Sequence, residues 1–228
     1  MTDIVALGEP LIEFSQLPGG RQYKQDFGGD TSNFAIAAAR AGARTAYLTS
    51  VGDEPFGRML IDLWQREGVD CSAVTLDDSA PTGIYFISHG SHGHEFSYRR
   101  AGSAASRMRF TEAFAQRIEQ ARWLHVSGIS QAIGERACDT VFEAVAHARR
   151  HGVKISYDLN FRPRLWPAAR ASAIARATIA ACELFLPSID ESRLLFGIDD
   201  PHRLIDLAHE CGASLVAVKL GARGALVS

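Results

Sequence analysis

The chain has 228 residues with 24 basic and 26 acidic side chains, which gives a net charge of -2. This length suffices for one large domain with a buried core, and the balanced charge excludes the basic surface typical of proteins that bind nucleic acids or anionic membranes. No apolar run reaches the roughly 18 residues of a membrane span, and Met1–Ile4 lacks the features of a signal peptide. We therefore expect a cytoplasmic protein with neither a nucleic-acid nor a membrane partner.

The cysteines lie far apart, without a C-x-x-C pair and without histidines at metal-ligand spacing. This pattern indicates neither a zinc site nor a disulfide framework. We expect buried free thiols at Cys71, Cys138, Cys182 and Cys211.

Short runs rich in β-forming residues alternate with helical patterns along the chain. The strand-like runs are residues 4–7, 45–49, 123–126, 154–157, 184–186 and 215–219. The helical patterns are residues 34–42, 56–67, 135–151, 167–181 and 201–211. Such alternation predicts an α/β fold with an open, mostly parallel sheet that carries helices on both faces.

A glycine-containing stretch, residues 27–33, leads into the first of these helical patterns. Gly28 and Gly29 allow a positive φ or a close approach of the backbone to a ligand. Asp30–Ser32 are residue types that cap helix N-termini, and Asn33 offers a donor and an acceptor to a polyol. Taken alone, the stretch fits an ordinary capped helix as well as it fits a ligand site.

A β-hairpin breaks the alternation. Residues 82–88 and 95–100 are strand-like and are joined by the turn-rich segment 89–94. With residues 11–15, and with 22–27 as a further candidate, they would form a small second sheet. Such a sheet commonly serves as a lid that excludes water from a cleft, and the alternative is a hairpin that extends the core.

The lid predicted in this way spans about residues 10–27 and 82–100. Strand alternation places Phe96, Tyr98 and Arg100 on one face, which suggests a ligand or partner surface. The tip carries three histidines that could form a metal site, but a glycine-containing tip of this kind is more typically solvated. These histidines are His89, His92 and His94.

Polar residues follow most of the predicted strands, at the edge where open α/β sheets bind their ligands. After residues 154–157, extended spacing would place Asp158, Asn160 and Arg162 on one side. An acceptor, an amide and a guanidinium suit a polyol or an acid. The alternative is an Asp–Arg pair that fastens a loop.

Several nucleotide-binding and catalytic motifs are absent from the sequence. It contains no G-x-x-x-x-G-K-[ST], no G-x-G and no G-x-S-x-G. A Walker-type phosphate loop, a dinucleotide-binding Rossmann enzyme and an α/β-hydrolase elbow are therefore not indicated. The nearest glycine-rich phosphate loop is Lys219-Leu220-Gly221-Ala222-Arg223-Gly224.

The ordered motifs resemble the ribokinase-like (PfkB) sugar kinases, and among them the 2-keto-3-deoxygluconate kinases, over essentially the whole chain. The resemblance rests on residues 28–33, 98–106 and 158–162, the last followed by Leu165-Trp166. It implies a kinase domain over residues 1–228. It also implies that the following residues bind the substrate: Gly28, Gly29, Asp30, Asn33, Tyr85, Tyr98, Arg100, Asp158, Asn160 and Arg162.

Two arginines in this set favour an anionic sugar, because a guanidinium holds a carboxylate bidentately and a neutral hexose lacks that group. The resemblance further implies ATP and Mg²⁺, with nucleotide contacts from Ser188, Lys219, Gly221 and Gly224. Where the family carries N-x-x-E, this chain has Ser188-Ile189-Asp190-Glu191. The glutamate, Glu191, is expected near Mg²⁺ in an indirect role.

A second departure concerns the family's G-A-G-D signature, which supplies an anion hole and the catalytic Asp base. The resemblance implies that this signature lies beyond Ser228, so we expect no catalytic base within residues 1–228, weak binding of sugar acid and no turnover by these residues alone. The expected reaction of the intact enzyme is in-line transfer of the ATP γ-phosphoryl group to a hydroxyl.

Three functional interpretations remain open from the sequence. The first is phosphorylation of a sugar acid, with 2-keto-3-deoxygluconate converted to its 6-phosphate. The second is a kinase for another sugar, such as fructose or a different deoxy-sugar acid. The third is a sugar-binding or regulatory protein without catalysis. An exposed lid sheet also predicts a homodimer or higher homo-oligomer formed through the lid.

Overall fold

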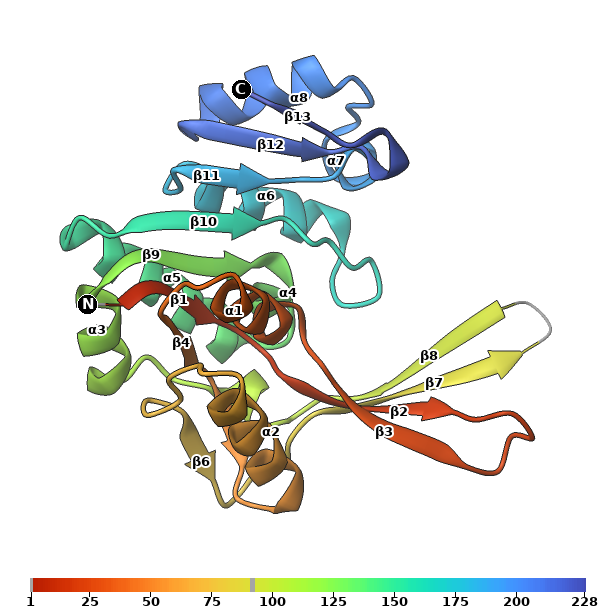
Figure 1. The fold of residues 1–228 in the computed structure, drawn as a ribbon. Coiled ribbons are helices and arrows are strands. Elements are labelled where there is room, and N and C mark those ends of the chain that lie inside the picture. The colour runs from red at the N-terminus through yellow and green to blue at the C-terminus, as the bar shows by residue number, and fades with distance from the viewer. Residues whose placement is uncertain (1, 91–92) are drawn as a thin grey trace.

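The computed structural model describes residues 2–90 and 93–228 and contains a main sheet with strand order β13-β12-β11-β10-β9-β1-β4 (Figure 1). Neighbouring strands run parallel except β12 and β13. The strands are β1 (Thr2–Leu7), β4 (Thr45–Leu48), β9 (Ala121–Ser127), β10 (Lys154–Asp158), β11 (Leu184–Leu186), β12 (Leu215–Lys219) and β13 (Ala225–Val227). All six predicted strand-like runs therefore lie in this sheet.

Helices cover both faces of the main sheet, as predicted. They are α1 (Asp30–Arg40), α2 (Pro55–Arg66), α3 (Glu112–Glu119), α4 (Gly128–Ala132), α5 (Glu135–Arg150), α6 (Ala168–Ile179), α7 (Ile189–Phe196) and α8 (Pro201–Cys211). Along β1, Ala6 belongs to a core cluster with Ile36 of α1 and Trp64 of α2. Its neighbours on either side, Val5 and Leu7, belong to the core under α3, α5, α6 and α8. This alternation is the two-residue period of a strand buried on both sides.

A second sheet extends away from the main sheet, as Figure 1 shows, and contains the predicted hairpin. Its order is β3-β2-β7-β8, and β7 and β8 are antiparallel. The strands are β2 (Leu11–Gln16), β3 (Tyr23–Gly28), β7 (Ile84–Gly90) and β8 (Gly93–Arg99). We call this sheet the lid sheet; its movement stays a prediction. A small separate pair is formed by β5 (Ser50–Gly52) and β6 (Thr75–Asp77).

The lid sheet has two aromatic faces. On one face Tyr85 stacks on Tyr98, with ring centroids 5.6 Å apart, and Phe96 lies 6.4 Å from Tyr85. On the other face Phe14 stacks on Phe86 at 5.5 Å. The predicted placement of Phe96 and Tyr98 on one face is therefore confirmed. At the tip, His89 and His94 are exposed and lie 2.9 Å apart through their Nδ1 atoms, whereas His92 lies outside the described residues.

The four cysteines are free thiols; Cys138 and Cys182 are buried, and Cys71 and Cys211 are half-buried. Burial raises the pKa of the Cys182 thiol to about 12, which keeps it protonated. Within residues 2–90 and 93–228, no helix combines the length and apolar character required to cross a bilayer.

Candidate functional site

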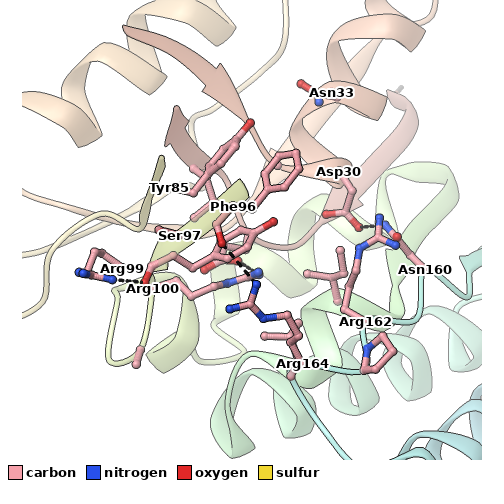
Figure 2. A pocket seen from close by; sticks show the side chains of 18 residues that line it. Asp30, Asn33, Tyr85, Phe96, Ser97, Arg99, Arg100, Asn160, Arg162 and Arg164 are labelled. Atoms are coloured by element: carbon pink, nitrogen blue, oxygen red, sulfur yellow. Dashed lines mark hydrogen bonds and ion pairs between the residues drawn. The ribbon is translucent and has the colours of Figure 1, made fainter. Parts of the chain in front are cut away.

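A cleft of about 810 Å³ lies between the Tyr85 face of the lid sheet and the carboxyl edge of the main sheet (Figure 2). The lid contributes Tyr85, Phe96 and Tyr98. The opposite wall consists of the start of α1, with Asp30, and the loop that follows β10, with Asn160. The cleft therefore occupies the edge at which open α/β sheets bind ligands.

The start of α1 is built differently from the sequence prediction. Gly29 is the N-cap, with a φ of 105°, and no side chain caps the helix. The prediction that Asp30–Ser32 cap the helix is wrong, because distant partners engage two of these side chains. The Thr31 hydroxyl lies 2.9 Å from the Tyr47 hydroxyl, and Ser32 accepts a hydrogen bond of 2.8 Å from the Trp64 indole. Burial of these bonds fixes the first turn of α1 against the core.

Asp30 occupies the floor of the cleft with one oxygen engaged and one without a partner. Its Oδ2 accepts hydrogen bonds from the Ser127 hydroxyl and from the Asn160 side-chain amide, the latter at 2.8 Å. Its Oδ1 is buried and has no hydrogen-bond partner among the described residues. A buried acceptor of this kind suits a ligand hydroxyl, because leaving it unpaired costs about 1–3 kcal/mol.

The loop after β10 separates residues that the sequence prediction had placed together. Asn160 has a φ of 36°, so the backbone is not extended there. Asn160 and Arg162 line the cleft, whereas Asp158 accepts a hydrogen bond of 2.6 Å from Lys219 Nζ and is not among the lining residues. The expectation that Asp158, Asn160 and Arg162 share one side is therefore wrong. The ion pair of Asp158 is made with Lys219, not with Arg162.

Four arginines line the cleft from its two sides, as Figure 2 shows: Arg99 and Arg100 from the lid side, and Arg162 and Arg164 from the loop after β10. Arg100 and Arg162 were predicted, but Arg99 and Arg164 were not. Arg164 Nη1 donates a hydrogen bond of 3.3 Å to the Phe96 carbonyl and so joins the β10 loop to the lid sheet. In the sequence Arg162-Pro163-Arg164, the second arginine follows a predicted site residue by two positions, and this spacing could have indicated Arg164 as a further site residue.

The chain passes between the main sheet and the lid sheet near Glu9 and again near Arg100. A buried ion pair joins these two connecting segments. Glu9 lies between β1 and β2, and Arg100 follows β8. The Glu9 side chain is fully buried, the Arg100 side chain is 11% exposed, and Arg100 Nη2 donates to Glu9 Oε2. Arg100 Nε has no partner among the described residues. Arg100 thus engages Nη2 with Glu9, and its Nε and Nη1 make no hydrogen bond to the described residues and can donate to a ligand.

Desolvation raises the pKa of Glu9 to about 7, against the opposing effect of Arg100, and the nearby Asp30 charge raises it further. The folded state therefore holds a proton that an unfolded chain, with its usual glutamate pKa of 4.5, has released. We expect the free energy of unfolding to fall by up to about 3 kcal/mol as pH rises from about 4.5 to about 7.

This pH effect can be measured by urea unfolding at several pH values, with Glu9→Gln as the comparison. The difference in unfolding free energy between the parent and Glu9→Gln should decrease with rising pH through that window. A difference that stays constant from pH 4.5 to pH 8 would contradict the raised pKa of Glu9.

The residues predicted to contact a nucleotide lie beside one another at the ends of β11 and β12. Ser188 pairs with Lys219 in an isolated β-bridge. Gly221, with a φ of 61°, begins a short 3₁₀ turn, residues 221–223, and Gly224, with a φ of 88°, follows it. Because both glycines adopt positive φ, the turn folds back and Leu220 donates to the Gly224 carbonyl at 2.8 Å.

Glu191 connects this region to the cleft. Its Oε2 accepts from the backbone N–H and hydroxyl of Ser188, each at 2.8 Å, in a capping box at the start of α7. Its Oε1 accepts from the Phe161 N–H at 2.8 Å. One carboxylate therefore fixes both α7 and the loop that presents Asn160 and Arg162.

Comparison with known proteins gives consistent results. A family model described as pfkB family carbohydrate kinase matches residues 1–228. A relative from Thermoproteus tenax, named 2-dehydro-3-deoxygluconokinase, is 36% identical and is matched over 100% of this chain and 72% of its own length. The crystal structure of a PfkB protein from Polaromonas sp. JS666 has a TM-score of 0.93 at 29% identity, covering 100% of this chain and 79% of that one. The crystal structure of a fructokinase with bound ATP from Xylella fastidiosa has a TM-score of 0.88 at 26% identity, covering 98% of this chain and 70% of that one.

Proposed function

Because the chain belongs to the pfkB family of carbohydrate kinases, we propose that it transfers the γ-phosphoryl group of ATP to a hydroxyl of a sugar acid. The leading substrate is 2-keto-3-deoxygluconate (2-dehydro-3-deoxygluconate), with the 6-phosphate as product. The name of the Thermoproteus tenax relative supports this choice. The resemblance to a fructokinase supports a neutral sugar as the alternative substrate.

One observation carries the proposal: the cleft combines a buried acceptor with cationic donors. Asp30 Oδ1 has no partner among the described residues at its floor, and Arg100 and Arg162 line it from the lid side and from the β10 loop. A sugar acid has hydroxyl donors for the aspartate and a carboxylate for the guanidinium groups. A neutral hexose would leave the arginines without an anionic partner.

The other substrate contacts follow from position in the cleft. Asn33 and Asn160 offer amide groups to hydroxyls, and Tyr85 and Tyr98 cover the sugar from the lid. Gly29 lines the cleft beneath it, and Gly28 beside it leaves room for the lid, because a Cβ on Gly28 would lie 2.6 Å from the Tyr85 ring. Asp158 does not line the cleft. We assign it to the proposed nucleotide site, because it is bonded to Lys219.

We assign the nucleotide to Ser188, Lys219, Gly221 and Gly224. Lys219 supplies a positive charge and the glycine turn supplies backbone close to the phosphates. Mg²⁺ would neutralise charge on the transferring phosphoryl group. Both oxygens of Glu191 already accept hydrogen bonds, so this residue fits an indirect role toward Mg²⁺ better than direct ligation.

A phosphorylation screen of the protein expressed from its full gene, with ATP and Mg²⁺, tests this function. We expect 2-keto-3-deoxygluconate to give the highest kcat/KM and Arg162→Ala to lower it about 10- to 100-fold through KM, because a hydrogen bond to a charged group is worth about 1.5–3 kcal/mol. The exposed Arg170 of α6, changed to Ala, is the matched control and should leave kinetics unchanged.

Two outcomes would replace the proposal. Preference for fructose, with turnover insensitive to Arg162→Ala, would indicate a neutral-sugar kinase. Saturable binding of the sugar acid without phosphorylation of any sugar would indicate a binding protein.

The partner that we propose for the lid is a second copy of this chain. Leu17, in the turn between β2 and β3, and Tyr23, the first residue of β3, are exposed large side chains, at 39% and 41%. Sedimentation in solution would then give the mass of a homodimer or higher homo-oligomer. The four free thiols suit a reducing compartment, which supports the cytoplasm as the location.

A further inference from the structure

Three side chains with metal-ligating atoms meet far from the cleft. Glu119 ends α3, His147 lies in the last turn of α5, and His151 is the C-cap of α5. One ligand atom from each lies within 4.8 Å of the others. Since α5 leads into the start of β10, this cluster lies at the amino edge of the main sheet, and the cleft lies at the carboxyl edge. We call Glu119, His147 and His151 the His-Glu cluster.

The spacing in the His-Glu cluster approaches that of a tetrahedral metal site. Glu119 Oε1 lies 2.9 Å from His147 Nε2 and 3.5 Å from His151 Nε2. Ligand atoms around tetrahedral Zn²⁺, with bonds of about 2.0–2.1 Å, lie about 3.3–3.4 Å apart. Small rotations of the exposed Glu119 and His151 side chains about the largely buried His147 would equalise these distances. The two histidines are four residues apart on one helix, which presents both rings on the same side.

Hydrogen bonding already prepares His151 as a ligand. Its Nδ1 lies 2.9 Å from the His147 carbonyl oxygen, so this nitrogen carries the proton. The lone pair is therefore on Nε2, the atom that faces Glu119. Metal-binding histidines commonly donate their second N–H to a carbonyl in this way.

The His147 ring needs one rearrangement. Its Nδ1 lies 3.4 Å from the Arg150 guanidinium, and its Nε2 is the atom near Glu119. Binding a metal through Nε2 places the proton on Nδ1, so Arg150, which is exposed, must turn to solvent. The carboxylate of Glu119 and the negative end of the α5 dipole both favour a cation here.

We propose that the His-Glu cluster binds one divalent transition-metal ion, of which Zn²⁺ is the expected class. Two imidazoles and one carboxylate suit Zn²⁺ rather than Mg²⁺, which prefers oxygen ligands and octahedral geometry. The fourth position would be held by water. The ion would fasten the end of α3 to the end of α5 and so stabilise the fold; it takes no part in phosphoryl transfer.

Titration of the chelator-treated full chain with Co²⁺ and Zn²⁺ tests the site. We expect one ion per chain, the visible absorption of four-coordinate Co²⁺ and a higher thermal midpoint with Zn²⁺. His147→Gln and His151→Gln should each weaken Zn²⁺ binding more than tenfold and abolish the Zn²⁺-dependent shift. The matched controls are Glu112→Gln, on the same α3, and His202→Gln, on α8.

The variants change exposed or partly exposed side chains, so circular dichroism should show native folds. Equal Zn²⁺ binding by the parent and by His151→Gln would overturn the proposal. The absence of saturable binding by the parent would do so as well, and the cluster would then be an ordinary His–Glu ion pair.

Discussion

The variant Arg100→Ala should be less stable than the parent at pH 7 by up to about 3 kcal/mol, because the fully buried Glu9 loses its cation and must take up a proton to avoid remaining an unpaired buried charge. Loss of substrate binding in this variant would therefore mix two causes. Arg100 both closes the junction between lid and core and offers a donor to the cleft. The unfolding free energy from urea denaturation should be measured before any kinetic interpretation.

Two comparisons separate these causes. Arg99→Ala removes the neighbouring exposed arginine and should change stability by less than about 0.5 kcal/mol. In Glu9→Leu/Arg100→Met, no buried charge remains, so most of the lost stability should return. If Arg100→Ala matches the parent in stability, the ion pair does not hold the lid junction. At pH 5 the difference between Arg100→Ala and the parent should shrink, because Glu9 of the parent is then protonated as well and its ion pair with Arg100 is lost.

The second large effect is expected at Gly29. A Cβ on this residue would lie 2.4 Å from the Glu9 carbonyl oxygen and 2.8 Å from Pro10 Cα, which are backbone atoms that cannot rotate away. The positive φ of 105° adds strain for any L side chain. We expect Gly29→Ala to cost about 3 kcal/mol or more and to shift the start of α1, with loss of sugar binding.

Gly42→Ala is the matched control for Gly29→Ala. Gly42 also has a positive φ, of 92°, but a Cβ there would have no neighbour within 4 Å. Gly42→Ala should lower the free energy of unfolding only by the strain of the left-handed backbone conformation, about 1–2 kcal/mol. Similar urea midpoints for the two variants would show that contact with the Glu9 backbone is unimportant.

Six of the seven strands of the main sheet were predictable because each is a short apolar run followed by a turn residue. The missed helices are short: α3 and α7 have eight residues each, and α4 has five. The lid hairpin was visible because its turn-rich tip interrupts two alternating strands. Elements that are defined by the local pattern of apolar and turn residues could thus be predicted from the sequence.

Side-chain partners across long sequence distances were not predictable. Ser32 resembled a capping residue, yet it accepts a bond from Trp64, 32 residues away. Glu9 was visible as a polar residue after β1, but its pairing with Arg100 depends on how the lid crosses the core. The backbone turn at Asn160, which moves Asp158 out of the cleft, leaves no periodic signal either.

The Glu191 carboxylate has a consequence for how the two substrates influence each other. It is bonded to Ser188, where we place the nucleotide, and to Phe161, between two residues of the sugar cleft. A nucleotide that displaces Ser188 would move Phe161 through a single side chain. By linkage, any gain in sugar affinity caused by nucleotide must be matched by an equal gain in nucleotide affinity caused by sugar. Glu191 thus offers a direct route for such cooperativity.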